Sequence, residues 1–323
     1  MTIRLGFDHF SIRDLGWKAP ALVDYARDLG VQVLLLSDLD VHESLEDGAL
    51  RELRSRADHA GIALHVGTGS ICPSSVMFDP RRGTAREQLE TTIRVARALG
   101  SPVARCFLGR GEDRATPGGI GVHIRHTIAT CRVVRSVAID SGVKIALENH
   151  AGDLTARELV GLIQEAGPEY VGATMDSGNA TWTQEDPLES LELLGPHALT
   201  TGIRDSRVWE TPEGTAVQWV AMGDGAVDWP VYLNRFGVLC PGAPFVLEII
   251  PGAPRIFPRP KDPGNSWLRF SAMARRGTPP AGPPPRSDDP GVQKGALERS
   301  LRYVRELLAG RITSAGRDAP RRA

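Results

Sequence analysis

The chain has 323 residues, and 41% of them are hydrophobic, so it can bury a large core. A single α/β barrel takes about 250 residues, which leaves room for one such domain with additions. The formal net charge of -1 argues against general affinity for nucleic acids, because that affinity needs a basic face.

Short apolar runs alternate with amphipathic stretches in the first part of the chain. This alternation predicts strands at 3–7, 31–36, 62–66 and 102–107, and helices at 19–29, 45–60, 86–99 and 120–141. The glycine-rich stretch 67–70 is expected to form a loop after the third strand, flexible enough to approach a ligand closely. Arg105 lies inside the fourth predicted strand.

The stretch 143–180 reads as strand, helix, strand, with an acid at the end of each strand. The first apolar run ends in Glu148, and the second ends in Asp176. Thr155 begins the helix between them, whose apolar residues have the spacing of one buried face. In parallel α/β folds, ligands bind at the C-terminal ends of the strands. The two carboxylates are therefore candidates for a functional site.

A third acid has the same placement. Helices are predicted at 188–194 and 229–236 and strands at 199–203 and 245–250, the last of which contains Glu248 between Leu247 and Ile249. A buried carboxylate without a partner costs several kcal/mol, so it must be paired, protonated or bound to a metal. For one such acid a salt bridge is the simpler interpretation. For three at equivalent positions, a shared divalent cation is favoured.

Eight strands that alternate with helices predict a (β/α)₈ TIM barrel. The alternative is an open doubly wound sheet, but no GxGxxG opens a helix. We expect one domain over 1–310, completed by a helix at 296–308, and a disordered basic tail over 311–323. A Pro-rich insertion after the eighth strand, 252–293, would lie on the catalytic face. A lid or partner-facing wall and a plain surface excursion are equal alternatives for it.

Several motifs resemble those of one family, in order as well as in content. LENHAGDLT, MDSGNA, EDPLESLELLGP, IRDS, and GDGAVDW before LEII are similar to the xylose isomerase-like TIM barrels, the sugar isomerase/epimerase group related to endonuclease IV. The resemblance implies a divalent metal held by Glu, Asp, His and Glu from four strands. Glu148, Asp176 and Glu248 match three of these ligands, and Mn²⁺ or Mg²⁺ suits their oxygens.

The fourth ligand departs from the family pattern. Where the family usually reads His-x-Lys-Asp, this chain reads Gly202-Ile203-Arg204-Asp205. A glycine has no side chain with which to bind a metal, so water, substrate or another residue would have to take the position. Gln218, in a predicted loop, is one candidate donor.

Five further residues are candidates for binding substrate. His150 shares the strand-end face of Glu148 or the loop above it, and the resemblance adds Asn179; the alternatives are an ordinary loop histidine and a turn residue. His9 ends the first strand and is equally consistent with a structural role. Arg204 and Arg207 suit a carboxylate or phosphate, with a mutual salt bridge to Asp205 as the equal alternative.

The expected chemistry is proton abstraction next to a metal-bound carbonyl, through an enediolate. Glu148 and Glu248 are the candidates for removing and returning the proton, which gives a sugar isomerase or epimerase. One alternative is a lyase or decarboxylase on an oxo-sugar acid that uses the same intermediate. Another is a barrel that lost its metal activity with the histidine. No phosphate-binding signature follows the last strands, which favours an unphosphorylated sugar derivative.

The remaining expectations concern location and partners. The four cysteines are widely spaced without a CxxC pair, as is typical of thiols in a reducing compartment. No basic and apolar leader opens the chain, and no run approaches the ~20 apolar residues of a membrane span. We expect a cytoplasmic enzyme whose partner is a small carbohydrate, with no nucleic acid and no membrane. Assembly into a homo-oligomer is left open.

Overall fold

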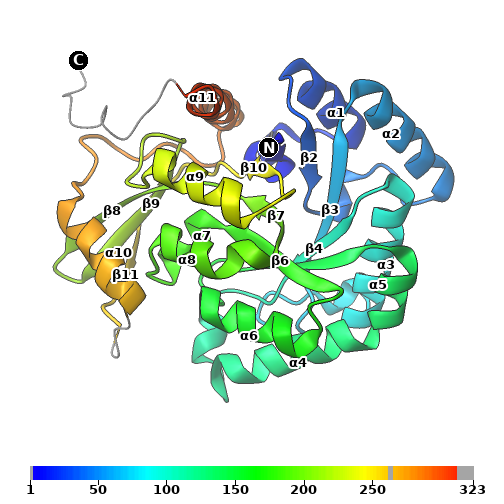
Figure 1. Cartoon of the computed structure of the whole chain (residues 1–323), viewed down its shortest axis with the longest axis horizontal. Coiled ribbons are helices and arrows are strands. Elements are labelled where there is room, and N and C mark those ends of the chain that lie inside the picture. The colour runs from blue at the N-terminus through cyan, green and yellow to red at the C-terminus, as the bar shows by residue number, and fades with distance from the viewer. Residues whose placement is uncertain (1–2, 261–264, 311–323) are drawn as a thin grey trace.

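Eight of the apolar runs form the strands of one parallel sheet in the computed structural model, which describes residues 3–260 and 265–310. The strands lie in the order β10-β1-β2-β3-β4-β5-β6-β7. A parallel bridge between Ile203 and Leu247 joins the two edges, so the sheet closes nearly completely (Figure 1). The predicted (β/α)₈ barrel is therefore confirmed. Its strands are β1 Leu5–Asp8, β2 Val33–Leu36, β3 Ala63–Ser70, β4 Val103–Phe107, β5 Lys144–Glu148, β6 Val171–Asp176, β7 Ala198–Gly202 and β10 Phe245–Leu247.

Amphipathic helices surround the sheet. They are α1 Ala19–Asp28, α2 Asp47–Ala60, α3 Ala85–Leu99, α4 Gly119–Val133, α5 Arg135–Ser141, α6 Ala156–Ala166, α7 Ser177–Trp182, α8 Pro187–Leu194, α9 Trp229–Leu239 and α11 Pro290–Leu308. Short 3-10 turns lie between them: η1 His9–Leu15, η2 Leu39–Val41, η3 Pro80–Arg82, η4 Gly111–Ala115 and η5 Gly195–His197. Thr84 and Thr155 begin α3 and α6 with capping boxes, each closed by the glutamate three residues later.

Two details of the sequence-based assignment are wrong. The single helix expected at 120–141 is broken at Val134, whose φ of -101° and ψ of 6° separate α4 from α5. The stretch 67–70 is not a loop, because β3 continues to Ser70 and pairs with β4 across an irregular register. Glycine inside a strand often marks a bulge, and the register with β4 shifts here between Gly67 and Ser70.

A second, smaller sheet was not predicted. β8 Asp205–Thr211 and β9 Gly214–Val220 form an antiparallel hairpin, and β11 Arg255–Phe257 pairs with β9. Helix α10 Asn265–Arg276 packs on this sheet beside the barrel (Figure 1). The buried cluster between them consists of Val208, Val217, Phe270, Met273 and Ala274.

The small sheet changes the interpretation of two segments. Gln218 lies within β9, so its expected place in a loop is wrong. The Pro-rich segment 252–293 supplies β11 and α10, and its role as a lid stays a prediction. The domain limits also stay predictions, and the tail 311–323 lies outside the described residues. No helix within 3–260 and 265–310 is long and apolar enough to cross a membrane.

Side chains of alternate strand residues fill the barrel interior. Val33, Leu35 and Val246 form one buried cluster there. His65 of β3 reaches across the barrel, and its Nδ1 lies 2.9 Å from Oγ1 of Thr200 on β7. Burial lowers the pKa of His65 from 6.5 to about 3, and the charge of Arg4 acts in the same direction. The folded barrel therefore holds this imidazole neutral.

This histidine predicts how stability depends on pH. Because its folded pKa lies below its unfolded value, the stabilisation is fully present above pH 6.5 and is lost as the pH falls towards 3. Over that window the free energy of unfolding of the wild type should fall by up to about 1.4 kcal/mol per pH unit more than that of His65→Gln. The glutamine keeps a hydrogen-bonding side chain but does not titrate. Urea unfolding at several pH values measures the difference, and parallel stability curves for the two proteins would contradict it.

Candidate active site at the barrel mouth

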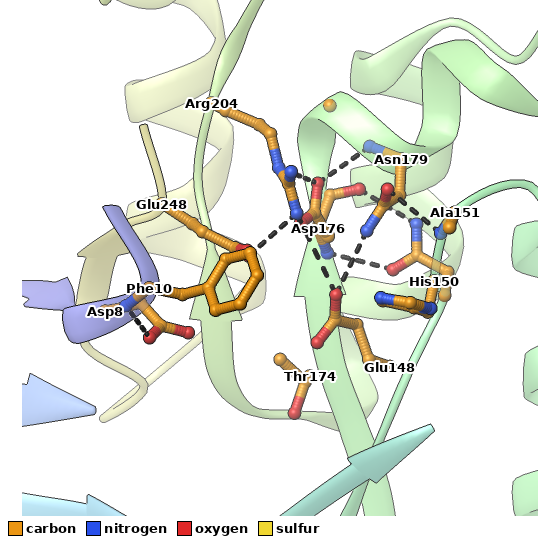
Figure 2. A network of polar contacts seen from close by, with 12 residues as sticks. Asp8, Phe10, Glu148, His150, Ala151, Thr174, Asp176, Asn179, Arg204 and Glu248 are labelled. Carbon is orange, nitrogen blue, oxygen red and sulfur yellow. Dashed lines mark hydrogen bonds and ion pairs between the residues drawn. The ribbon is translucent and has the colours of Figure 1, made fainter. Parts of the chain in front are cut away.

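Three carboxylates meet at the C-terminal end of the barrel. Glu148 is the last residue of β5, Asp176 is the last residue of β6, and Glu248 follows β10 directly. Each side chain points into the barrel (Figure 2) and is buried, and each offers an oxygen within 4.8 Å of the other two. The three acids predicted from the sequence are thus brought together, and as a group they could bind a metal ion.

The guanidinium of Arg204 lies between these acids. Its Nε is 2.9 Å from Oδ2 of Asp176, and its Nη2 contacts the same oxygen. The same Nη2 donates to Oε2 of Glu248 at 2.7 Å and lies 4.0 Å from Oε1 of Glu148 (Figure 2). Arg204 is only 2% exposed. One cation therefore neutralises charge on all three acids.

A second buried arginine holds Glu148 from the other side. Arg105 of β4 donates from Nε to Oε2 of Glu148 at 2.6 Å, and its Nη2 contacts the same oxygen. Asn179 donates to the other oxygen, Oε1, at 3.0 Å. Burial raises the pKa of Glu148 to about 7, with Arg105 opposing the rise and the charge of Asp176 adding to it. Such a carboxyl can exchange protons near neutral pH.

Glu248 also has a raised pKa, and unlike Glu148 it faces open space. Burial raises its pKa well above the usual 4.5, which Arg204 opposes and the charge of Asp8 reinforces. It lines two cavities of about 270 Å³ and 180 Å³ that share Phe10, Met77 and His150 as well, so they form two halves of one space. Glu248 is thus the acid of the three that a ligand in this space can reach directly.

His150 forms part of the wall of both cavities. Its ring stacks on Phe107 with centroids 3.8 Å apart, and its Nδ1 donates to the Gly109 carbonyl at 2.6 Å. Burial lowers the pKa of His150 to about 3, and the charge of Arg105 acts in the same direction. The imidazole is therefore neutral, with Nε2 left as an acceptor for a hydroxyl group.

The structure separates the other predicted substrate-binding residues into two groups. Asn179 and Arg204 line the smaller cavity with His150. His9 lies beside Asp8, and its Nδ1 accepts a hydrogen bond from the backbone N–H of Ser37 at 3.2 Å. It does not line either of the two cavities.

Arg207 and Gln218 lie on the small sheet, away from the two cavities. Arg207 donates to the carbonyl of Asp224 at 3.1 Å, and Gln218 donates to the carbonyl of Gly252 at 2.8 Å. Neither residue lines the two cavities, so the role of Gln218 as the fourth metal donor stays a prediction.

The alternative salt bridge of Asp205 with Arg204 and Arg207 is not formed either. Asp205 instead accepts hydrogen bonds from the backbone of Gly223 and Gly225 and from the indole of Trp229.

Sequence reasoning missed the role of Arg105. An arginine inside the apolar strand VARCF is as costly to bury as a glutamate, so it needs a partner on a neighbouring strand. β4 pairs with β5 in a register that sets Phe107 opposite Glu148, and the two side chains of Arg105 and Glu148 meet inside the barrel. That signal was present in the sequence. The aromatic wall of Phe10 and Phe107 had no comparable signal.

The residues present do not fit a divalent metal as they stand. The spacing and chemistry of the three carboxylates suit a cation, but Arg204 pairs with the oxygens of Asp176 and Glu248 that would face it. The position of the fourth ligand is Gly202, which offers no donor. A metal could bind here only if the guanidinium moved away.

Comparisons with known proteins place this geometry in context. The sequence pattern of the family described as Xylose isomerase-like TIM barrel matches residues 23–265. A curated relative, 3-oxo-isoapionate decarboxylase of Pectobacterium atrosepticum, is 23% identical over 185 residues, which cover 57% of this chain and 60% of that protein. The chain thus spans about three fifths of the length of this relative.

Solved structures share the fold at low identity. D-psicose 3-epimerase from Clostridium cellulolyticum H10, crystallised with D-tagatose, has a TM-score of 0.61 and 16% identity, covering 95% of this chain and 99% of its own. The IolI protein with a zinc atom has a TM-score of 0.65 and 13% identity, covering 96% and 100%. With a family match over most of its length and the same barrel, the chain belongs to the xylose isomerase-like TIM barrel family.

Proposed function

We propose that this protein is an enzyme that moves a proton at the carbon next to the carbonyl of an unphosphorylated sugar derivative, as an isomerase or epimerase. One observation carries the proposal: Glu248, a buried carboxylate with a raised pKa, lines the cavity at the barrel mouth together with the neutral His150. The sugar epimerases among proteins of the same fold support the substrate class.

The positions of the side chains suggest a different catalytic role for each. Glu248 is the acid that a bound substrate can reach, so we assign it the removal of the proton. Glu148, with its pKa near 7, is the second acid, and we assign it the return of a proton from deeper in the site. We assign His150 Nε2 the role of accepting a hydrogen bond from a substrate hydroxyl group, with Phe10 and Phe107 as apolar walls of the cavity.

Metal dependence stays a prediction from the family resemblance. Mn²⁺ or Mg²⁺ in this family would supply Lewis-acid polarisation of the carbonyl. The arrangement of Arg204 does not accommodate such an ion, so no step of this proposal relies on one.

A decarboxylase is the second candidate, favoured by the curated relative described above. That relative is a decarboxylase of an oxo acid by its name, although the identity is only 23%. Arg82, Arg110 and Arg255 line the two cavities together with the two buried arginines, and guanidinium groups suit a substrate carboxylate. When CO₂ leaves a 2-hydroxy-3-oxo acid, the electron pair of the broken carbon–carbon bond passes to the 3-oxo group and gives an enediolate, the type of intermediate that proton removal also gives.

Isotope exchange tests the main proposal. The enzyme is incubated in D₂O with a panel of keto-sugars and oxo-sugar acids, and the products are examined by NMR and for released CO₂. We expect deuterium at the carbon next to the carbonyl, because that carbon loses and regains a proton. Glu248→Gln should abolish the exchange, and Glu148→Gln should slow it at least about 100-fold, the usual size of a general acid–base contribution.

Glu192→Gln is the matched control. Glu192 is exposed on α8 and pairs with Arg235 across the surface, so its removal should leave exchange unchanged. Product formed without solvent deuterium, or full exchange in Glu248→Gln, would contradict the assignment. CO₂ without isomerised product would select the decarboxylase.

The Arg105–Glu148 pair predicts an effect on stability. Arg105→Met should destabilise the fold by about 3 kcal/mol or more, because it leaves a buried carboxylate without its ionic partner. Adding Glu148→Gln should restore part of the loss. Urea unfolding measures both, with Arg235→Met as the control that breaks an exposed ion pair screened by solvent. Equal effects of Arg105→Met and Arg235→Met would show that the buried pair is not needed.

A further inference from the structure

We propose that Arg204 is the resident cation of this site: its guanidinium takes the position between the carboxylates in place of a divalent metal and binds the substrate oxygen on which negative charge develops. The part of this inference that concerns substrate rests on the function proposed above. The part that concerns the cation stands on the geometry alone.

The contacts of Arg204 are those that a shared cation would make. Nη2 touches Asp176 and Glu248 and lies 4.0 Å from Glu148, so one nitrogen sits within ion-pair distance of all three acids. These acids form the one group of candidate metal ligands found among the described residues. The guanidinium of Arg204 supplies the positive charge that these three acids require.

Gly202 makes room for this guanidinium. A Cβ atom at this position would lie 2.9 Å from Oδ2 of Asp176 and 3.1 Å from Oε2 of Glu248, the two oxygens that Nη2 binds. A larger side chain at 202 would therefore enter the space between those carboxylates. Residues 202 and 204 lie two apart on an extended segment and so face the same side. Glycine at position 202 therefore leaves the space that the side chain of Arg204 occupies.

The Arg204 side chain is packed closely against its neighbours, unlike a mobile surface residue. Its guanidinium carbon lies 4.1 Å from the ring centroid of Trp219, which itself stacks on Trp182 with centroids 4.0 Å apart. The aliphatic part of the arginine lies against Gly178, where a Cβ atom would come within 2.1 Å of Cγ of Arg204, so glycine is needed at this position. The indole of Trp219 donates to the carbonyl of Gly178 and fixes the two walls together.

One part of the guanidinium remains available to a ligand. Nε and Nη2 are bound to the acids, whereas Nη1 has no hydrogen-bond partner within the described ranges. Arg204 lines the smaller cavity beside Glu248 and His150. A fixed N–H donor on a buried side chain stabilises a developing oxyanion, as a metal would. The ligand that fits is an oxygen of an α-hydroxy carbonyl compound that becomes an enediolate.

Metal binding tests the cation directly. Wild-type protein dialysed against EDTA is titrated with Mn²⁺ by calorimetry and by electron paramagnetic resonance of free Mn²⁺. We expect no stoichiometric uptake by the wild type, and about one ion per chain in Gly202→His/Arg204→Ala, because that double variant removes the guanidinium and adds the missing donor. Arg235→Ala, which removes an exposed arginine of α9, is the control and should behave as the wild type.

Activity tests the substrate contact. In the deuterium-exchange assay, Arg204→Ala should lower kcat about 100-fold or more, the usual cost of one oxyanion donor. Added guanidinium ion should restore part of the lost rate in Arg204→Ala and should leave the rate of Arg235→Ala unchanged. If Arg204 had only a structural role, added guanidinium ion would not restore the rate. Circular dichroism confirms that each variant is folded.

The outcomes separate the two proposals. Uptake of one Mn²⁺ per chain by the wild type, lost in Glu248→Gln, would overturn the resident cation whether or not exchange occurs. Full exchange in folded Arg204→Ala would overturn the substrate contact. The two proposals can also fail separately. If no substrate exchanges deuterium, the proposed function is overturned. If the wild type at the same time binds no Mn²⁺ while the double variant binds one ion, the resident cation is supported.

Discussion

The site depends on how buried negative charge is neutralised. Glu148, Asp176 and Glu248 crowd within 4.8 Å of one another in the barrel mouth, away from bulk water. Such a group is stable only with cations close by, because each unpaired charge would cost several kcal/mol. Arg204 supplies a positive charge at the centre of the group, and Arg105 supplies a second one beside Glu148. The raised pKa values of both glutamates follow from the same burial and crowding.

The barrel supplies the geometry for this arrangement. Parallel strands end at one edge, so residues far apart in the chain meet there without any loop having to fold back. The small sheet adds an aromatic wall beside Arg204, which the barrel strands do not provide. Its hairpin begins directly after Arg204, carries Trp219 over the guanidinium, and is buried in turn by α10 from the Pro-rich segment. That segment thus supports the wall of the site at a distance, and Arg255 from its strand lines the cavity.

Much of the fold could be predicted from the sequence, but the centre of the site could not. The strands are short apolar runs between amphipathic helices, and that periodicity is a local property. The three acids end or follow such runs, so their meeting point followed from the fold. The place of Arg204 depends on space left by Gly178 and Gly202 and on a wall from Trp219, contacts that no local pattern records. The hairpin was missed because its residues mix charges and glycine with short apolar stretches.

In our proposal, the Arg204 guanidinium and not a metal ion occupies the middle of the acid cluster. A crystal structure grown in Mn²⁺, with diffraction recorded at the manganese absorption edge, tests it most directly. We expect no anomalous peak among Glu148, Asp176 and Glu248, and density for the Arg204 guanidinium in contact with Asp176 and Glu248 and within ion-pair distance of Glu148. An anomalous peak ligated by those carboxylates, with Arg204 turned away, would contradict it.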